Sequence, residues 1–224
     1  MMKAPERYHD RAHAGQVLAR ALTDHTARKP LHDPIVLALP RGGVPVAFPV
    51  AQALDAPLDL LFVRKIGAPG QPEFAIAAVV EGAEDAVVTN PDIVEGLRLP
   101  DGWLEEGRLR AIAEIARQRN DYRAGRTRLP VAGRSVIIVD DGVATGTSLF
   151  AAIAAVQRQD PRDITVAVPV APPEILARLR DAVDHVICPL APRLFQAVGF
   201  FYDDFHQVED DEVIMALAGA PCRG

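Results

Sequence analysis

Cysteine is scarce in this sequence. The 224 residues contain two cysteines: Cys188 follows an apolar run, and Cys222 lies in the C-terminal tail. Small domains built on disulfides carry several closely spaced cysteines in a short chain. The sequence therefore indicates no disulfide framework, and we expect a reducing, cytoplasmic environment.

Blocks of like charge and long apolar runs are also lacking. The chain has 24 basic and 30 acidic residues, a net charge of −6, so a nucleic-acid partner is not indicated. We interpret the basic stretch Arg117–Arg128 as a solvated helix end and a connection to the next strand. No apolar run approaches the roughly 20 residues that cross a membrane, and charged residues precede the first apolar run. We expect neither a membrane partner nor a signal peptide.

Two common nucleotide-binding motifs are absent. Neither GxGxxG nor GxxxxGK[ST] occurs, which argues against a dinucleotide-binding turn and a nucleoside-triphosphate loop. We find no Ser/His or Cys/His constellation that would indicate a hydrolase. The length suits one α/β domain with a single substantial core.

The centre of the chain is a strand that ends in two acids. The apolar, β-branched run Val136–Val139 predicts a strand buried on both faces. Asp140 and Asp141 follow at once, then a loop of small residues. Leu149–Gln157 contains strong helix formers and neither Pro nor Gly, so it predicts a helix that starts at the end of that loop. A lone Asp-Asp pair is usually a solvated turn, but the apolar run leading into this one argues against that.

This arrangement suits a phosphorylated sugar. Free N–H groups at a helix start bind phosphate, and each hydrogen bond to a charged group contributes roughly 1.5–3 kcal/mol, against about 0.3–1 kcal/mol from the helix dipole. An ionised carboxylate only accepts hydrogen bonds, which suits a neighbouring diol. We expect Asp140 and Asp141 to hold the sugar hydroxyls. We expect the phosphate to be bound by Ala144, Thr145, Gly146, Thr147 and Ser148.

Strands and helices alternate along the rest of the chain. Strands are predicted at Ile35–Leu39, Leu58–Val63, Asp163–Val170 and Asp184–Ile187. Helices are predicted at residues 10–22 with Asp10 as the cap, at Val44–Leu54 with a kink or break at Pro49, from Asp101 through Ala116, at Pro172–Arg180 and at Glu209–Leu217. This alternation predicts a parallel sheet with right-handed crossovers, and ligands of such sheets bind at the carboxyl ends of the strands.

The segment Asp140–Ser148, with two acids and a Thr-Gly-centred loop between strand and helix, resembles the phosphoribosyl pyrophosphate (PRPP) loop of type I phosphoribosyltransferases. The resemblance implies an α/β fold: a parallel-sheet core with flanking helices, a flexible-loop hairpin and a small hood from the C-terminal segment. It implies Mg²⁺-dependent transfer of the 5-phosphoribosyl group of PRPP to a nucleobase-like nitrogen acceptor with release of pyrophosphate, and a homodimer. We expect one domain over residues 1–224, with a core at about 33–190, a hood at about 191–217 and helix 10–22 packed on the core.

Two more strand ends carry groups that suit an anion. Arg41, Gly42 and Gly43 follow the first predicted strand, at the position where the family's loop holds pyrophosphate, and the resemblance implies a strained or cis peptide there. Arg64 and Lys65 follow the next strand and enter a Gly/Pro-rich stretch, which we expect to be a mobile lid over the anion. A solvent-facing basic turn is the alternative.

The lid resembles the flexible loop of the purine enzymes. Glu73–Val80 and Ala86–Thr89 predict the hairpin that carries it. The resemblance makes Arg64 and Lys65 catalytic together with the two motif acids.

The stretch Leu194–Phe205 is aromatic and acidic, and it resembles the hood of hypoxanthine-guanine phosphoribosyltransferases. The match implies that Ala197 and Val198 contact a base through their backbone and that Phe195 or Phe200 stacks on it. It implies that Asp203 contacts a magnesium-bound water. A small aromatic cluster closing the core is the alternative for each aromatic residue.

Two departures concern the acceptor. The 6-oxopurine enzymes carry an acidic base at the fifth motif residue, which is Ala144 here, and a lysine after the following strand, whereas Val166–Ala171 contains none. The resemblance therefore supports PRPP binding more strongly than a purine acceptor. A regulatory module that senses PRPP without transferring it is the alternative function.

Overall fold

The computed structural model describes residues 6–81, 86–89, 96–97, 99–123 and 127–221. Cys222 and most of the segment 90–100, predicted to be irregular, lie outside these residues. Five strands form a parallel sheet in the order β2-β1-β6-β7-β8, which confirms the predicted fold class. Their bounds are β1 (Ile35–Ala38), β2 (Leu58–Leu60), β6 (Ser135–Val139), β7 (Asp163–Ala167) and β8 (His185–Ile187).

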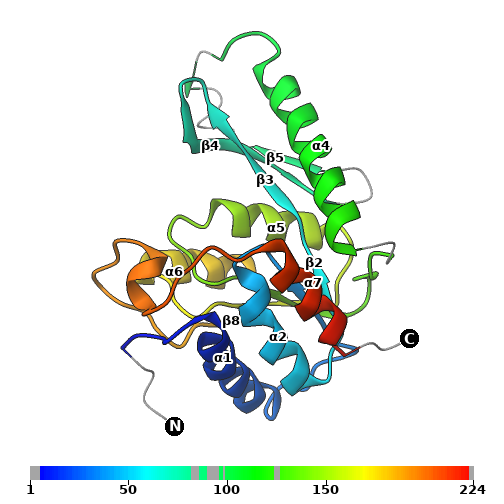
Figure 1. The fold of residues 1–224 in the computed structure, drawn as a ribbon, viewed down its shortest axis with the longest axis vertical. Coiled ribbons are helices and arrows are strands. Elements are labelled where there is room, and N and C mark those ends of the chain that lie inside the picture. The colour runs from blue at the N-terminus through cyan, green and yellow to red at the C-terminus, as the bar shows by residue number, and fades with distance from the viewer. Residues whose placement is uncertain (1–5, 82–85, 90–95, 98, 124–126, 222–224) are drawn as a thin grey trace.

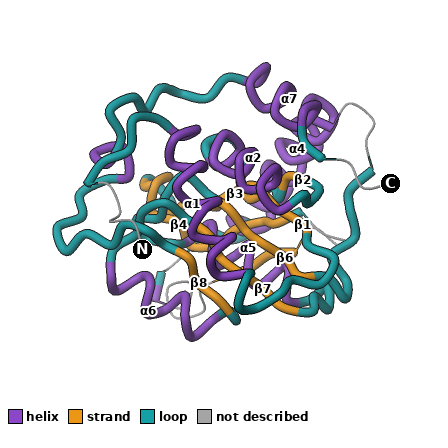
Figure 2. The backbone as a smooth tube through the Cα atoms, turned by 90° about the horizontal axis from the view of Figure 1, so that it is seen from below, coloured by secondary structure: helices purple, strands orange, loops and turns teal. Residues whose placement is uncertain are grey.

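Helices cover both faces of this sheet, whose strands run side by side in Figure 2. They are α1 (Arg11–Thr26), α2 (Gly43–Leu54), α5 (Thr147–Gln157), α6 (Pro173–Ala182) and α7 (Asp210–Gly219). Side chains alternate along a strand, so Val36 and Ala38 pack with α1, α2 and α7. Ile35 and Leu37 pack on the other face with α5 and α6. The run of apolar residues in β1 thus fills two cores, as a doubly covered strand requires.

In the first two helices the predicted cap is confirmed, and of the kink or break predicted at Pro49 the break is excluded. Asp10 caps α1 by accepting a hydrogen bond from the backbone N–H of His13 at 2.7 Å. Pro49 lies inside α2, which continues to Leu54, so the break that a mid-helix proline suggests does not occur. The two helices pack so closely that a Cβ on Gly15 of α1 would lie 2.6 Å from the carbonyl oxygen of Val46.

A second, antiparallel sheet has the order β3-β4-β5, with β3 (Val63–Ala68), β4 (Gln71–Val80) and β5 (Ala86–Thr89). It lies between α4 (Trp103–Arg123) and α5, and it stands with α4 above the parallel sheet in Figure 1. The predicted strand Leu58–Val63 is confirmed for Leu58–Leu60 as β2, but its predicted end is wrong, because the chain leaves the parallel sheet after Leu60 and enters β3 at Val63. The predicted hairpin is confirmed as β4 and β5, but the expected lid is itself the strand β3 and a turn.

The end of α4 is buried and charged, which corrects the prediction of a solvated helix end. Arg117 is exposed as expected, but Arg123 is 5% exposed. Its guanidinium donates to Asp59 at 3.0 Å and to both carboxylate oxygens of Glu81, a residue with no exposed surface. Charges this deep are stable only when paired, and these pairs join α4 to the ends of β2 and β4.

Among the described residues, no helix is both long and apolar enough to cross a membrane.

Candidate active site

The two predicted anion-binding loops lie side by side. β1 and β6 are neighbours in parallel register, so the loops that follow them emerge at the same edge of the sheet. The backbone N–H of Leu39 donates to the carbonyl of Val139 at 2.9 Å, just before the loops begin. One loop leads into α2 at Gly43 and the other into α5 at Thr147. The edge therefore presents the start of two helices together.

The two loops touch through glycines. A Cβ on Gly42 would lie 2.1 Å from Oδ2 of Asp141, and a Cβ on Gly43 would lie 2.8 Å from the carbonyl oxygen of Val139. Any larger residue at position 42 would displace the carboxylate of Asp141. The peptide bond between Pro40 and Arg41 is cis, as expected for this loop.

The start of α5 is open for an anion. Gly146 precedes the helix with a φ of 79°, and no side chain caps the first N–H groups. The hydroxyls of Thr145 and Thr147 lie 3.4 Å apart beside this helix start. Ala144 and Thr145 are exposed, while Ser148 is half-buried. Uncapped amides with adjacent hydroxyls can bind a phosphate.

The two acids of the motif have different partners. Asp140 accepts a hydrogen bond from the backbone N–H of Asp141 at 2.9 Å. Asp141 accepts one from Nε of Arg11 at 2.8 Å. Burial raises the pKa of the Asp140 carboxyl well above its usual range, and the charge of Asp141 adds to the rise against the opposing charges of Arg11 and Lys65. Burial also raises the pKa of Asp141, opposed by the charge and hydrogen bond of Arg11.

Arg11 is a site residue that the sequence analysis missed. It lies at the first position of α1, yet its side chain reaches the end of β6, and the residue is only 8% exposed. One signal was present: a cation in the first helical turn is unfavourable beside the positive end of the helix dipole, and no acid lies in that turn to offset it. A cation at such a position has a partner elsewhere in the fold.

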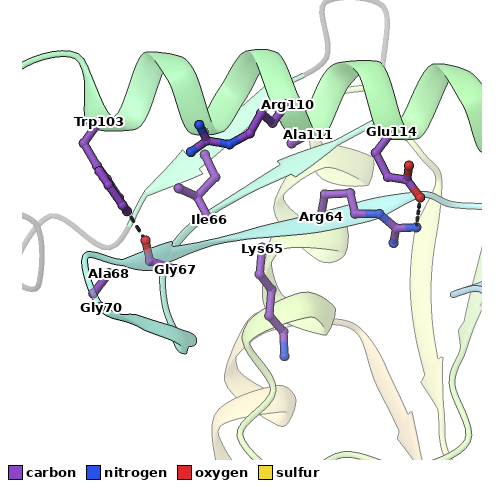
Figure 3. A pocket seen from close by; sticks show the side chains of 11 residues that line it. Arg64, Lys65, Ile66, Gly67, Ala68, Gly70, Trp103, Arg110, Ala111 and Glu114 are labelled. Atoms are coloured by element: carbon purple, nitrogen blue, oxygen red, sulfur yellow. Dashed lines mark hydrogen bonds and ion pairs between the residues drawn. The ribbon is translucent and has the colours of Figure 1, made fainter.

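The adjacent residues Arg64 and Lys65 point in opposite directions (Figure 3). Because they lie in β3, successive side chains alternate between its faces. Arg64 faces α4 and pairs with Glu114 at 3.6 Å. Lys65 points away from α4, and its charge lowers the pKa of Asp140. The two cations were predicted to act together, but their side chains lie on opposite faces of β3.

A cavity of about 370 Å³ lies on the Arg64 side, between β3 and α4. Its lining includes Arg110 and Trp103, whose indole Nε1 donates to the carbonyl of Gly67 at 3.0 Å. Trp103 is thus a packing residue at the helix start, as expected.

The hood closes directly on the motif. Val198, at the start of a 3-10 helix (Val198–Phe201), lies against Gly142, where a Cβ would be 2.5 Å from Cγ1 of the valine. Phe195 packs on Phe201 with ring centroids 5.3 Å apart, so its ring belongs to an aromatic cluster. Phe200 is 62% exposed. Ala197 precedes the 3-10 helix in extended conformation.

The N-terminal residues are part of the hood, which the sequence analysis did not foresee. Tyr8 forms a parallel bridge with Tyr202, and its hydroxyl donates to the carbonyl of Pro169 at 2.7 Å. The hydroxyl of Tyr202 donates to the backbone carbonyl of Asp141 at 2.5 Å, and burial raises the pKa of this tyrosine. The hood therefore contacts the second motif acid directly.

The remaining predicted residues are more exposed. Arg41 pairs with Asp210 at 3.3 Å, and Asp210 also accepts a hydrogen bond from the hydroxyl of Tyr122. Asp203 pairs with Arg7 at 3.4 Å, and its side chain is 59% exposed. The structure thus ties Arg41 to α4 and α7, and it ties Asp203 to the N-terminal segment.

Known proteins are similar to this chain in sequence. The family model described as "Phosphoribosyl transferase domain" matches residues 6–200. "Putative phosphoribosyl transferase Rv0571c" of Mycobacterium tuberculosis (strain ATCC 25618 / H37Rv) is 41% identical over 210 residues, which cover 94% of this chain and 46% of that protein. The same values hold for "Putative phosphoribosyl transferase MT0597" of strain CDC 1551 / Oshkosh. This chain spans about half the length of these curated relatives.

A solved structure is also similar. The crystal structure of TT1426 from Thermus thermophilus superposes with a TM-score of 0.78 at 44% identity, and the match covers 94% of this chain and 97% of that one. Because the family model covers most of the chain and includes both loops at the edge of the sheet, this protein belongs to the phosphoribosyl transferase domain family.

Proposed function

We propose that this protein transfers the 5-phosphoribosyl group of PRPP to a nucleobase-like nitrogen acceptor and releases pyrophosphate. The observation that carries the proposal is the meeting, at one sheet edge, of the uncapped start of α5, the paired acids and the loop of Arg41, Gly42 and Gly43. These are the groups that a phosphate, a diol and a departing anion each need. Family membership supports the same reaction class.

The 5′-phosphate binds at the start of α5, through the loop from Ala144 to Ser148. The ribose diol is held by Asp140 and by the oxygen of Asp141 that Arg11 leaves free. In the reaction the bond between the anomeric carbon and the pyrophosphate oxygen breaks, so positive charge grows on the ribose. The nearby carboxylates stabilise that charge, and removing one such stabiliser in other enzymes costs roughly 2.7–4 kcal/mol.

In this proposal the pyrophosphate lies against the loop of Arg41, Gly42 and Gly43, and Lys65, whose side chain points away from α4, supplies a cation from β3. Arg64 is not assigned to this step, because its side chain pairs with Glu114 on the opposite face of the strand. Lys65 offers a point charge to the leaving group as negative charge develops there.

Mg²⁺ fits this donor set as an ion carried by the substrate. Among the described residues, no group of three or more His, Cys, Asp or Glu is placed to hold a metal, and Mg²⁺ in such sites keeps waters and substrate phosphate oxygens as ligands. When bound it would neutralise the pyrophosphate charge. Asp203 is exposed enough to contact a magnesium-bound water.

The motif offers the acceptor no acidic base at its fifth residue. Ala144 stands where the purine enzymes carry that base, and the stretch after β7 has no lysine to read an exocyclic oxygen. The exposed ring of Phe200 and the backbone at Ala197 and Val198 offer stacking and peptide groups. We therefore propose an acceptor whose nitrogen is already nucleophilic at neutral pH.

Incubation of the protein with Mg-PRPP and a pool of bases, followed by mass spectrometry, tests the proposal. New nucleotides and an equal amount of pyrophosphate are expected. Saturable binding of Mg-PRPP by calorimetry without any product would favour the alternative, a PRPP-sensing module. Absence of binding would refute both.

The organisation of the chain is part of the proposal. We propose that it acts as one phosphoribosyltransferase domain, with the N-terminal residues 6–10 joined to the hood, and that it forms a homodimer. Light scattering coupled to gel filtration measures the mass that tests the second statement.

A further inference from the structure

Arg11 joins three parts of the molecule. Its Nε donates to Oδ2 of Asp141 at 2.8 Å, and its Nη1 donates to the backbone carbonyl of His206 at 2.7 Å. The guanidinium lies 3.8 Å from the centroid of the Phe205 ring. The first position of α1 is thereby connected to the end of β6 and to the hood.

These contacts fix one rotamer of a long side chain that would otherwise be free. Ordering such a side chain is entropically unfavourable, and burying a guanidinium is unfavourable unless it is paired and hydrogen-bonded. Arg11 also lies at the unfavourable end of the helix dipole. The interaction with Asp141 offsets these terms, and it uses only one of the two carboxylate oxygens.

We propose that Arg11 is a positioning residue that orients the Asp141 carboxylate for the ribose diol and locks the hood onto the PRPP motif. The inference rests on the proposed binding of PRPP and goes beyond it. A planar guanidinium can hold a carboxylate and a carbonyl at once because its donors point in fixed directions. With Oδ2 held, Oδ1 faces a hydroxyl in one orientation.

The charged surroundings favour this role over a purely structural one. Asp140 lies on the same loop, and Lys65 acts on it from β3. The hood contributes the Tyr202 hydroxyl, bonded to the Asp141 backbone, and α7 contributes Glu212, whose pKa the charge of Arg11 helps to lower. Arg11 is the cation bonded to Asp141. Of the two positive charges that act on Asp140, Arg11 and Lys65, removal of Arg11 leaves Lys65.

The test compares Arg11→Gln, Arg11→Lys and a matched control. Arg20→Gln removes the same charge from the same helix at an exposed position outside the site. Mg-PRPP affinity is measured by calorimetry from pH 5.5 to 8.5, and thermal midpoints are recorded in parallel. The wild type and Arg20→Gln are expected to bind alike.

Arg11→Gln is expected to weaken binding by about tenfold or more at pH 7, the size of a lost charged hydrogen bond. Its acid limb, the part of the affinity profile in which binding weakens as the pH falls, is expected to move to higher pH. The reason is that the guanidinium no longer opposes protonation of Asp141. Arg11→Lys keeps the charge but cannot hold both acceptors, so its affinity falls less and its acid limb stays near that of the wild type. A role in folding alone would lower the thermal midpoint and leave the limb unmoved.

Different results would overturn the proposed function and the positioning role of Arg11. Mg-PRPP binding absent from the wild type would overturn the proposed function and this inference with it. Wild-type binding with Arg11→Gln equal to Arg20→Gln, in affinity and in pH limb, would overturn the positioning role alone. If Arg11→Gln does not fold, the test rests on Arg11→Lys. A Mg-PRPP affinity of Arg11→Lys equal to that of the wild type would overturn the positioning role.

Discussion

Replacing the two motif acids by asparagine is expected to change stability in opposite directions. Asp140 bonds to a backbone N–H and forms no ion pair with a cation of the described residues, whereas Asp141 pairs with the buried Arg11. Asp140→Asn removes a charge that burial and its neighbour disfavour. Asp141→Asn leaves a guanidinium without its carboxylate. The first variant should be more stable than the wild type at neutral pH, and the second less stable.

The magnitudes follow from these environments. Breaking a buried ion pair from one side costs about 3 kcal/mol at the lower end of the observed range, and one kcal/mol corresponds to roughly 2–4 °C in a chain of this size. Asp141→Asn should lower the thermal midpoint by about 6–12 °C. Each unit of pKa difference corresponds to about 1.4 kcal/mol, or roughly 3–6 °C in a chain of this size, so Asp140→Asn should raise the midpoint by several degrees.

The gain in stability from Asp140→Asn should depend on pH. The carboxyl of Asp140 has a higher pKa in the folded protein than in the unfolded chain, so the folded protein binds this proton more readily. The wild type therefore loses stability as pH rises from the unfolded pKa, about 3.9, towards the folded one. The advantage of the variant should be full above the folded pKa and shrink as pH falls towards 4.

Calorimetric unfolding without ligand at pH 4.5, 6 and 7.5 measures all three effects. Asp24→Asn, at an exposed position of α1, is the control and should stay within about 0.5 kcal/mol of the wild type. Thermal midpoints that moved in the same direction for both motif variants would refute the conclusion that the two acids have opposite effects on stability. A gain for Asp140→Asn that did not change with pH would refute its electrostatic origin.

Three other substitutions test separate parts of the structure. Lys65→Ala should lower kcat/KM for PRPP by about 100-fold or more and Arg64→Ala by far less, because Arg64 pairs with Glu114 of α4 and Lys65 lies on the opposite face of β3. Equal losses in steady-state assays would contradict this. Gly42→Ala should abolish Mg-PRPP binding in calorimetry, because its Cβ would lie 2.1 Å from a carboxylate oxygen of the second motif acid; unchanged affinity would contradict that contact. Arg123→Met should destabilise the fold by about 3–5 kcal/mol in urea unfolding, because it leaves the buried Asp59 without its guanidinium and the buried Glu81 with Arg119 as its remaining ion-pair partner; the double variant with Glu81→Leu should partly restore the loss.

Local patterns were sufficient for the central part of the site. The β-branched run before Asp140, the small-residue loop and the helix formers after it each depend on residues close in sequence. Parallel pairing then brings the loops after β1 and β6 to one edge. The strand, the loop and the start of α5 were predictable for this reason.

Residues whose environment depends on distant segments were not predictable in the same way. Arg64 and Lys65 lie among glycines and prolines and suggest a loop, but β4 pairs with them and makes a strand of alternating faces. Arg123 lies in a basic stretch that suggests solvent, yet its partners are more than 40 positions earlier in the chain. Arg11 reaches a carboxylate 130 positions away. Tertiary contacts outweigh local composition at each of these sites.

The different environments of Asp140 and Asp141 also explain why a motif of two identical residues is not redundant. Asp141 is held by Arg11, by the close approach of Gly42 and, through its carbonyl, by Tyr202. Burial disfavours the charged form of Asp140, and hydrogen bonds from a ligand can stabilise that form. A carboxylate satisfied by the protein loses existing bonds if it turns to a ligand, whereas one that is destabilised by burial gains from each hydroxyl that reaches it. Binding energy should therefore arise mainly at Asp140, while Asp141 sets the geometry in which that energy is gained.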